Sequence, residues 1–279
     1  MAKHKVEDIR NVALCGHGGA GKTTLVDTIL NHTGALKRQA SVDDGTSICD
    51  FDEEEKAHKY SIEAAVTNFD HAGKHFNLID TPGYPDFIGQ TIGALWGVDT
   101  AVIVVNAPSG IEVNTRRVFS EAKKAGLGRI VAINKMDADN IDFATLMDNI
   151  KDVFGAECVL LNVPLGQGSA FRGVASTLKV PDDIDGALID PNELSESLLE
   201  SIIVADDEVM ERYFEGEPPT AEELSRLMVQ AIAEGSLIPV VCLSGKTQVG
   251  LPEFLEALDM CALAPNVIPR TAADAEGND

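Results

Sequence analysis

The sequence predicts an α/β fold with a mostly parallel sheet that carries helices on both faces. Short apolar runs alternate with amphipathic helical patterns along most of the 279 residues. Hydrophobic residues make up 44% of the chain and aromatic residues only 5%, which is typical of the aliphatic core of a parallel sheet. A glycine-rich turn also connects the first apolar run directly to the first helical pattern. These three observations favour a nucleotide-binding type of α/β domain.

Six apolar runs are predicted to form the strands of the sheet: residues 11–15, 61–69, 75–79, 101–106, 129–133 and 238–243. A glycine-containing turn at 70–74 joins the second run to the third, which predicts an antiparallel hairpin. Five helices are predicted between and after these runs: residues 22–31, 86–96, 112–125, 142–153 and 251–262. Because strands alternate with helices, most neighbouring strands are expected to be parallel.

Residues 156–235 interrupt this alternation and are predicted to form a small inserted α+β subdomain. Strand-like segments at 158–164 and 173–180 flank a glycine-rich turn, and helical patterns follow at 192–214 and 221–234. The nucleotide-binding domain is therefore expected to comprise residues 1–155 and 236–265. Residues 266–279 are mostly small or polar and are expected to be a linker toward a second domain that is absent from this chain.

Charge and cysteine content exclude several functional classes. The net charge of −23 makes general binding to DNA unfavourable, although a local basic or dipolar patch can still contact RNA. The five cysteines have no C-x-x-C spacing, which argues against a disulfide framework or a zinc site. No apolar run is long enough to cross a membrane and no signal peptide is visible. We expect a cytoplasmic monomer without DNA or membrane partners.

Acidic residues are concentrated in the predicted insertion. Residues 182–223 contain fifteen acidic side chains, and Arg212 is the single basic one. Two interpretations remain open, namely a solvated polar face and a docking surface for a basic partner.

The first glycine-rich turn matches the phosphate-binding pattern G-x-x-x-x-G-K-[ST] and lies between a predicted strand and a predicted helix, as the pattern requires. This context makes the fold a P-loop NTPase. Glycines let backbone N–H groups approach phosphate oxygens, and the helix N-terminus adds positive potential. Lys22 is expected to reach the β- and γ-phosphates, and the hydroxyl of Thr23 is expected to bind Mg²⁺. The predicted phosphate-binding residues are Gly16, His17, Gly18, Gly19, Ala20, Gly21, Lys22, Thr23 and Thr24.

A second motif follows the third predicted strand and consists of Asp80, Thr81, Pro82 and Gly83. Asp80 is expected to bind Mg²⁺ through water. Gly83 has no side chain, so its N–H can approach a γ-phosphate closely and lose that contact on hydrolysis. The motif alone is also an ordinary turn. Its place on its own strand after the phosphate loop makes it a predicted γ-phosphate sensor.

A third motif, which follows the predicted strand 129–133, is expected to select guanine. It comprises Asn134, Lys135, Met136 and Asp137. The Asp137 carboxylate can accept hydrogen bonds from guanine N1–H and the 2-amino group, which adenine does not offer at that edge. Asn134 can hold the loop and Lys135 can cover the ring with its aliphatic stem. A fourth loop, with Ser244, Gly245 and Lys246, is expected to offer N–H groups to the guanine O6 atom.

These motifs, in this order, resemble those of the translation GTPases. The position of the insertion and the segment 211–217 are most similar to the first domain of elongation factor G. The resemblance covers nearly the whole chain. It implies GTP as substrate, GDP as product, Mg²⁺ as cofactor and the ribosome as partner, through ribosomal RNA and a stalk protein that the acidic insertion would contact. Translocation, recycling, rescue and antibiotic protection all remain open roles.

The chain departs from the family pattern at three positions. Tyr84 follows Gly83 where the family has a histidine that positions water, and a phenol with an ordinary pKa of about 10 is a poor base at neutral pH. Ser61 replaces the threonine of the first switch, although it keeps a hydroxyl for Mg²⁺. Gly19 replaces an aspartate. The preceding acidic segment 52–55 is expected to be a mobile switch loop rather than a pair of catalytic carboxylates.

Two functions from different classes follow. The first is a GTPase in which Lys22 and Gly83 contact the transferred phosphate and Tyr84 occupies the position beside the attacking water. Thr23 and Ser61 would bind Mg²⁺ directly, and Asp80 would bind it through water. The second is a GTP-gated binding module with little hydrolysis, because Tyr84 replaces histidine. A P-loop kinase or ATPase is a third alternative, which the guanine-selecting motif disfavours.

Overall fold

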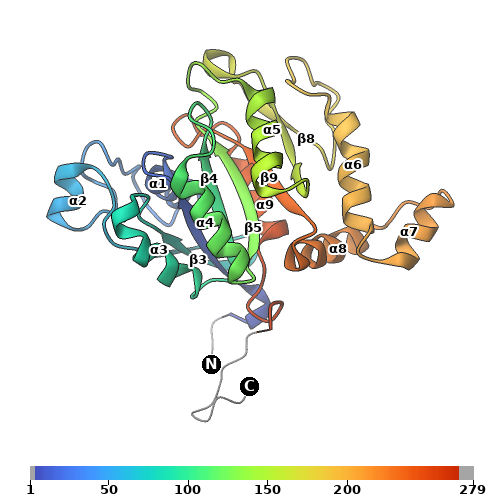
Figure 1. Cartoon of the computed structure of the whole chain (residues 1–279), viewed down its shortest axis with the longest axis horizontal. Helices are drawn as coiled ribbons and strands as arrows, with labels where there is room; N and C mark the ends of the chain where they lie inside the picture. Colours follow the sequence, from blue (N-terminus) through green and yellow to red (C-terminus); the bar gives the residue numbers. More distant parts are fainter. Residues whose placement is uncertain (1–3, 270–279) are drawn as a thin grey trace, which may run out of the picture.

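The computed structural model describes residues 4–269 and contains a central seven-stranded sheet with helices on both faces (Figure 1). The strand order is β2-β3-β1-β4-β5-β9-β6, and every pairing in it is parallel except that of β2 with β3. The sheet is formed by β1 (Ile9–Gly16), β2 (Ala65–His71), β3 (Lys74–Asp80), β4 (Thr100–Asn106), β5 (Gly128–Asn134), β6 (Cys158–Leu160) and β9 (Ile238–Cys242). The predicted fold class is confirmed.

Nine α-helices lie within the described residues. They are α1 (Lys22–His32), α2 (Glu53–His58), α3 (Ile88–Leu95), α4 (Val113–Lys124), α5 (Phe143–Phe154), α6 (Pro191–Ile203), α7 (Asp207–Phe214), α8 (Ala221–Glu234) and α9 (Leu251–Cys261). Short 3-10 helices occur at η1 (Val6–Asp8), η2 (Pro85–Phe87) and η3 (Gly168–Ala170). No helix between residues 4 and 269 is long and apolar enough to span a bilayer.

Alternating side chains of the central strands divide the core into two layers. Val12 and Leu14 of β1 pack in the layer that contains α1, α8 and α9, whereas Ala13 and Cys15 pack in the layer of α3, α4 and α5. Successive side chains of a strand point to opposite faces, so an uninterrupted apolar run is needed where both faces are covered. This two-sided burial explains why the central strands could be predicted from short apolar runs.

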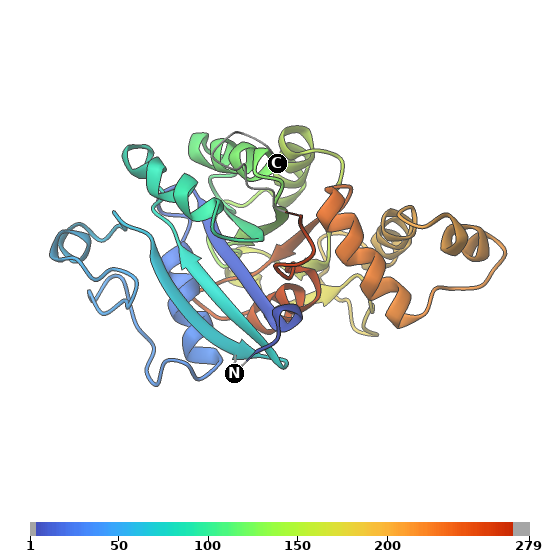
Figure 2. The same ribbon diagram turned by 90° about the horizontal axis from the view of Figure 1, so that it is seen from below.

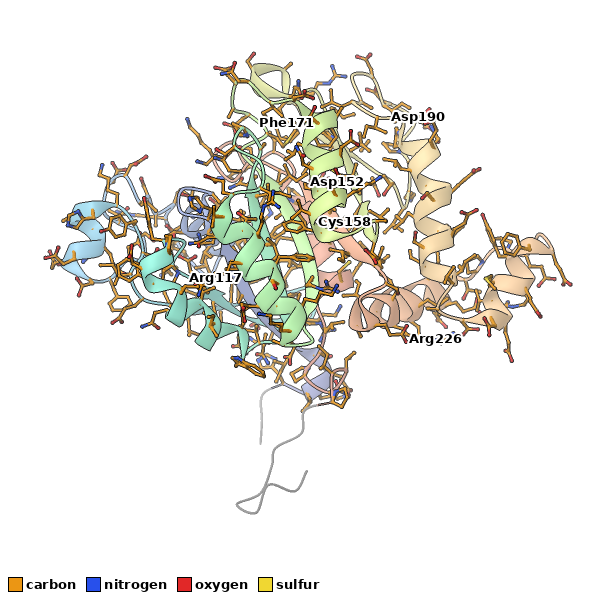
Figure 3. All side chains as sticks on the ribbon, in the orientation of Figure 1. Arg117, Asp152, Cys158, Phe171, Asp190 and Arg226 are labelled. Carbon is orange, nitrogen blue, oxygen red and sulfur yellow. The ribbon has the colours of Figure 1, made fainter. Side chains whose placement is uncertain are left out.

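The predicted insertion, residues 156–235, contributes β6 to the edge of the sheet and α8 to the layer on one of its faces, whereas α6 and α7 lie farther out (Figures 1 and 2). Its antiparallel pair consists of β7 (Asn162–Leu165) and β8 (Gly173–Ser176). Helix α6 begins after Asp190, whose side chain accepts from the Asn192 N–H, and it packs against α8, which carries Arg226 (Figure 3). Leu198 and Ile202 of α6 are fully buried. The insertion therefore shares the main hydrophobic core.

The structure corrects several predicted element boundaries. The strand-like segment 158–164 is two strands in different sheets, because β6 joins the main sheet and β7 pairs with β8. The predicted helix 192–214 is also two helices, since Asp206 caps a new helix at α7. The second strand begins at Ala65 rather than residue 61. The division into a core and an insertion at 156–235 stays a prediction.

The predicted tail is described only in part. Residues 270–279 of the expected linker lie outside the described residues. Before them, Val267 and Ile268 are partly buried and pack against the core. All five cysteines are buried and free.

Candidate functional site

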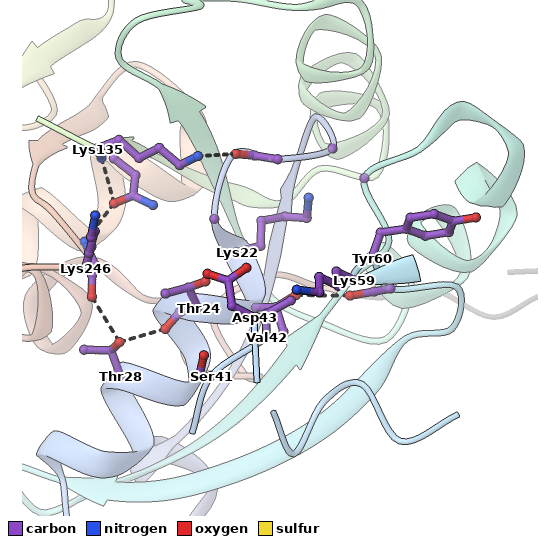
Figure 4. A pocket seen from close by; sticks show the side chains of 18 of the residues that line it. Lys22, Thr24, Thr28, Ser41, Val42, Asp43, Lys59, Tyr60, Lys135 and Lys246 are labelled. Carbon is purple, nitrogen blue, oxygen red and sulfur yellow. Dashed lines mark hydrogen bonds between the residues drawn. The ribbon is translucent and has the colours of Figure 1, made fainter. Parts of the chain in front are cut away.

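The predicted motifs converge on one cavity at the carboxyl ends of β1, β3, β5 and β9. In open α/β sheets this edge is where ligands bind. The cavity has a volume of about 860 Å³. Its lining includes Gly18, Gly19, Gly21, Lys22, Thr23, Thr24, Ser61, Gly83, Tyr84, Asn134, Lys135, Asp137, Gly245 and Lys246. Figure 4 shows side chains from the phosphate loop and from the guanine-selecting loop entering the same space.

The phosphate loop connects β1 to α1 through a backbone that glycine favours. Gly19 has φ +78° and Gly21 has φ +87°, which are left-handed conformations that cost little for glycine. A Cβ on Gly21 would lie 2.7 Å from the Asn134 Nδ2 atom, which donates to the Ala20 carbonyl at 2.9 Å. His17 Nε2 lies 3.4 Å from a carboxylate oxygen of Glu112, so the loop is also held from the α4 side.

Lys22 is 5% exposed at the first turn of α1. Its Nζ donates to the carbonyls of Gly16 at 3.2 Å and His17 at 2.9 Å. Burial lowers the pKa of Lys22, and the nearby Asp80 carboxylate opposes that shift. The ammonium group therefore has carbonyl partners that phosphate oxygens can replace.

Four oxygen-bearing side chains form a hydrogen-bonded chain beside Lys22. Thr23 Oγ1 donates to Asp80 Oδ2 at 2.6 Å and lies 3.1 Å from Ser61 Oγ. Ser61 Oγ donates in turn to Asp50 Oδ1 at 2.8 Å. The structure thus brings the three predicted metal-site residues together and adds Asp50.

This oxygen cluster fits Mg²⁺, which prefers oxygen ligands and retains water. Asp80 is 1% exposed, and its Oδ1 atom has no hydrogen-bond partner among the described residues. Burial raises the pKa of Asp80 to about 7, while the Thr23 hydroxyl and the Lys22 ammonium oppose that shift. A cation at this position would favour the ionised carboxylate.

The loop after β3 lies directly against the phosphate loop. A Cβ on Gly83 would lie 2.6 Å from the Gly18 nitrogen and would also clash with Lys22 Nζ. Only glycine therefore fits at position 83 without a shift of the phosphate loop. Thr81 and Pro82 do not line the cavity; the Thr81 hydroxyl donates to the Leu14 carbonyl at 2.7 Å and ties the loop to β1.

Tyr84 is 41% exposed and its ring lies beside the phosphate loop. A Cβ on Gly18 would lie 3.1 Å from a ring carbon of Tyr84. The Tyr60 ring from the segment before Ser61 is 4.8 Å from the Tyr84 ring, measured between centroids, and Figure 4 shows Tyr60 at the rim of the pocket. The Tyr84 ring therefore joins the phosphate loop to the segment that carries Ser61.

The guanine-selecting loop is held together by the Asn134 side chain. Its Oδ1 accepts from the N–H groups of Lys135 at 2.8 Å and Gly245 at 2.9 Å. Lys135 Nζ donates to the Gly19 carbonyl at 2.7 Å and crosses the cavity (Figure 4). Asn134 therefore connects the phosphate loop, its own loop and the loop after β9. The sequence motifs predicted these loops separately, without this connection.

Asp137 and Met136 have different environments. Asp137 lines the cavity, and its buried Oδ1 has no hydrogen-bond partner among residues 4–269. An unpartnered buried acceptor is costly and is satisfied by a ligand that donates. Met136 is fully buried in the core and does not line the cavity. Ser244 is also fully buried, and its hydroxyl accepts from the Thr247 N–H at 3.1 Å.

Several lining residues were missed by sequence analysis. Asp50 and the segment from Gln39 to Asp43 lie in an irregular stretch without hydrophobic periodicity. The segment 52–55 was expected to be a mobile loop but contains the start of α2, where Asp52 and Glu55 form a capping box. The spacing Asp-x-x-Glu was the available signal, since it is a known pattern for a helix N-terminus.

Comparison with known proteins agrees with this geometry. Residues 7–264 match the family described as the elongation factor Tu GTP binding domain. The chain belongs to this family. It is therefore a GTP-binding domain of the translation GTPase type, and the predicted resemblance is confirmed.

Two curated relatives and one solved structure are similar to most of this chain. Proteins named elongation factor G-like protein from two strains of Mycobacterium tuberculosis, CDC 1551 / Oshkosh and H37Rv, are each 34% identical over an alignment of 259 residues that covers 89% of this chain. A crystal structure from Thermus thermophilus is 30% identical with a TM-score of 0.87 and covers 93% of this chain. The match spans 36% of each Mycobacterium protein and 41% of the Thermus chain.

Proposed function

We propose that this domain binds GTP with Mg²⁺ and hydrolyses the GTP to GDP and phosphate as part of a ribosome-associated factor of the elongation factor G type. The observation that carries the proposal is the convergence of three motifs on one cavity. Lys22, Gly83 and Asp137 all line it, and a buried oxygen of Asp137 has no partner among the described residues. This combination suits a nucleoside triphosphate, with the phosphates on the loop amides and the base beside Asp137.

Each group has a role in phosphoryl transfer, which depends mainly on positioning and electrostatics. Lys22 and the loop N–H groups stabilise charge on the phosphate oxygens. Thr23 and Ser61 would hold Mg²⁺ directly and Asp80 through water, with Asp50 orienting the Ser61 hydroxyl through their 2.8 Å hydrogen bond. The cation would supply further neutralisation of phosphate charge. Gly83 offers its N–H to the γ-phosphate.

Tyr84 decides between hydrolysis and a slow binding switch. Its ring is packed between Gly18 and Tyr60, and its side chain lines the cavity. A phenol there can orient a water molecule by hydrogen bonding but is a weak general base. A GTP-gated module with little hydrolysis is therefore the second candidate function.

Nucleotide competition tests binding. GTP and GDP are expected to displace a fluorescent GDP analogue at concentrations at least about a hundredfold below those needed for ATP, because only guanine satisfies Asp137. Equal displacement by ATP and GTP would contradict the proposal.

Single-turnover GTP hydrolysis with and without ribosomes tests the proposed hydrolysis and the ribosome as partner. The Tyr84→His variant is measured beside the parent protein. Strong stimulation of the parent supports a tyrosine-assisted GTPase. Rescue by histidine alone supports the binding switch. Stimulation of neither protein contradicts the ribosome as partner.

The acidic insertion is proposed to contact a ribosomal stalk protein. Asp207, Glu208 and Glu211 of α7 carry like charge and lie on a helix at the periphery of the insertion. Replacing these three residues by lysine keeps the buried α6–α8 contacts, unlike deletion of 182–223, which would remove Leu198 and Ile202 from the core. The triple variant is expected to lose ribosome stimulation and keep its GTP affinity. Unchanged stimulation would count against this contact.

A further inference from the structure

Two buried side chains hold the backbone on either side of Gly83. Thr91 of α3 is fully buried, and its Oγ1 donates to the Pro82 carbonyl at 2.9 Å. Asn114 of α4 is 2% exposed, and its Nδ2 donates to the Gly83 carbonyl at 2.7 Å. Neither side chain lines the nucleotide cavity. Their hydrogen bonds therefore act on the loop backbone and not on the nucleotide.

The first bond sets the direction of the Gly83 N–H. The Pro82 carbonyl and the Gly83 N–H belong to one planar trans peptide, so they point in opposite directions. Because Thr91 holds the carbonyl on the α3 side, the N–H is directed away from α3. The close approach of Gly83 to the Gly18 nitrogen and Lys22 shows that the phosphate loop lies against this glycine.

The second hydrogen bond, from Asn114, fixes the orientation of the next peptide, which joins Gly83 to Tyr84. With both flanking peptides held, the two soft dihedral angles of Gly83 have little freedom left. Glycine otherwise loses the most conformational entropy when it is ordered, so an unheld Gly83 would weaken γ-phosphate contact. Helices α3 and α4, on which Thr91 and Asn114 lie, pack on the same side of the sheet, where Arg117 marks α4 in Figure 3.

We propose that Thr91 and Asn114 are positioning residues that aim the Gly83 N–H at the γ-phosphate, so that preference for GTP over GDP depends on α3 and α4. This inference rests on the proposed function, in which Gly83 contacts the γ-phosphate. Movement of Gly83 after hydrolysis would pull on both helices through the same two hydrogen bonds. The pair thus links the state of the nucleotide to the helical face of the domain.

The test compares the affinities for GDP and for a non-hydrolysable GTP analogue in Thr91→Val, which keeps the side-chain volume and removes the hydroxyl. We expect the affinity for the GTP analogue to fall about fivefold, as for the loss of one net hydrogen bond, and the affinity for GDP to change less than about twofold. In Asn114→Ser the serine side chain is too short to replace the amide. This variant is expected to lose affinity for the GTP analogue and to keep its affinity for GDP, as Thr91→Val does. Thr91→Ser, which keeps the hydroxyl, should restore the parent ratio.

A matched control separates positioning from general stability. Thr177 is also fully buried and donates to the Leu160 carbonyl at 2.7 Å, far along the chain from the phosphate loop. Thr177→Val should lower the melting temperature without changing the ratio of the two affinities. Equal losses for GTP analogue and GDP in both Thr91→Val and Asn114→Ser, or no loss in either, would overturn the inference. Failure of the parent protein to bind GTP would instead reject the proposed function.

Discussion

At the scale of single residues, the phosphate loop depends on glycines in backbone conformations that other residues adopt only with strain. Gly21 combines a left-handed φ with contact to the Asn134 amide. Gly34, after α1, has a similar φ of +79°, and a Cβ there would meet no atom within 4 Å. Substitutions at the two glycines therefore distinguish the effect of backbone strain from the effect of disturbing the nucleotide site.

We predict that Gly21→Ala lowers GTP affinity at least about tenfold, because the new methyl group displaces Asn134 and with it the Ala20 carbonyl. Gly34→Ala should lower stability by about 1 kcal/mol through left-handed strain and leave GTP affinity unchanged. Fluorescence titration and thermal unfolding of both variants check this. Equal affinity losses would show that strain alone controls the site.

Asp27 on α1 is a buried acid outside the nucleotide cavity. It is fully buried, its Oδ1 accepts from the Ile48 N–H at 3.4 Å, and its Oδ2 has no partner among the described residues. Burial raises the pKa of Asp27, against the effect of hydrogen bonds from Ser47 and Ile48. The folded protein therefore holds this proton to a higher pH than the unfolded chain, and stability falls as pH rises through the folded pKa.

We predict that Asp27→Asn raises the melting temperature relative to the parent, by an amount that grows with pH. The gain should vanish below the unfolded carboxyl pKa of about 3.9, where Asp27 is neutral in both states. Thermal unfolding at a series of pH values checks the slope, with the exposed Asp148→Asn as control. A gain that is independent of pH would mean that ionisation of Asp27 is not its source.

At the scale of elements, one buried carboxylate holds the backbone on both sides of Ser61. Glu55 is fully buried and accepts from the N–H groups of Asp52, Ile62 and Glu63 at 3.0, 2.8 and 3.1 Å. A single side chain therefore fixes the start of α2 and the backbone that follows Ser61. Helix α2 has only six residues, which is too short to be stable by propensity alone.

We predict that Glu55→Ala melts α2 and releases Ser61 from the oxygen cluster. Hydrogen exchange of the amides at Ile62 and Glu63 should become faster, and the Mg²⁺ concentration needed for tight GTP binding should rise. Glu54→Ala, at an exposed neighbouring position, is the control and should change neither measurement. Unchanged exchange at Ile62 in Glu55→Ala would show that α2 is held by other contacts.

At the scale of the whole molecule, the excess of negative charge opposes compaction. The net charge is −23, and fifteen acidic residues fall within 182–223. Some of these acids are neutralised locally, since Asp206 pairs with Arg226 and Glu223 with Arg212. The remaining self-repulsion is reduced when salt shortens the Debye length to a few ångströms.

We predict that the melting temperature rises between low salt and about 0.5 M KCl, because screening relieves repulsion more than it weakens the few surface ion pairs. Hydrogen exchange should slow most in α6 and α7, where acids are concentrated. Calorimetry with and without salt checks the first part. A fall in melting temperature with salt would indicate that ion pairs outweigh repulsion.

Local chemistry allowed the nucleotide-binding core and its loops to be predicted. Apolar runs such as 101–106 become strands because both of their faces are covered. The glycine-rich motif that ends in Lys22 and Thr23 was recognised because it lies between a strand and a helix, where a phosphate-binding loop is expected. Family membership, confirmed by the match over residues 7–264, followed from the same motifs. Boundaries in the insertion were wrong where a short apolar run, such as 158–164, does not indicate which sheet each half joins.

The sequence by itself determined that this chain is a GTP-binding α/β domain, because motif spacing and hydrophobic period are local properties. Only the tertiary structure placed Asp50 beside Ser61, joined three loops through Asn134, and set Thr91 and Asn114 behind Gly83. These contacts connect residues in separate elements, several of them far apart in the chain. Which residues meet in these contacts depends on how the helices pack on the sheet, and no short segment of sequence encodes that packing.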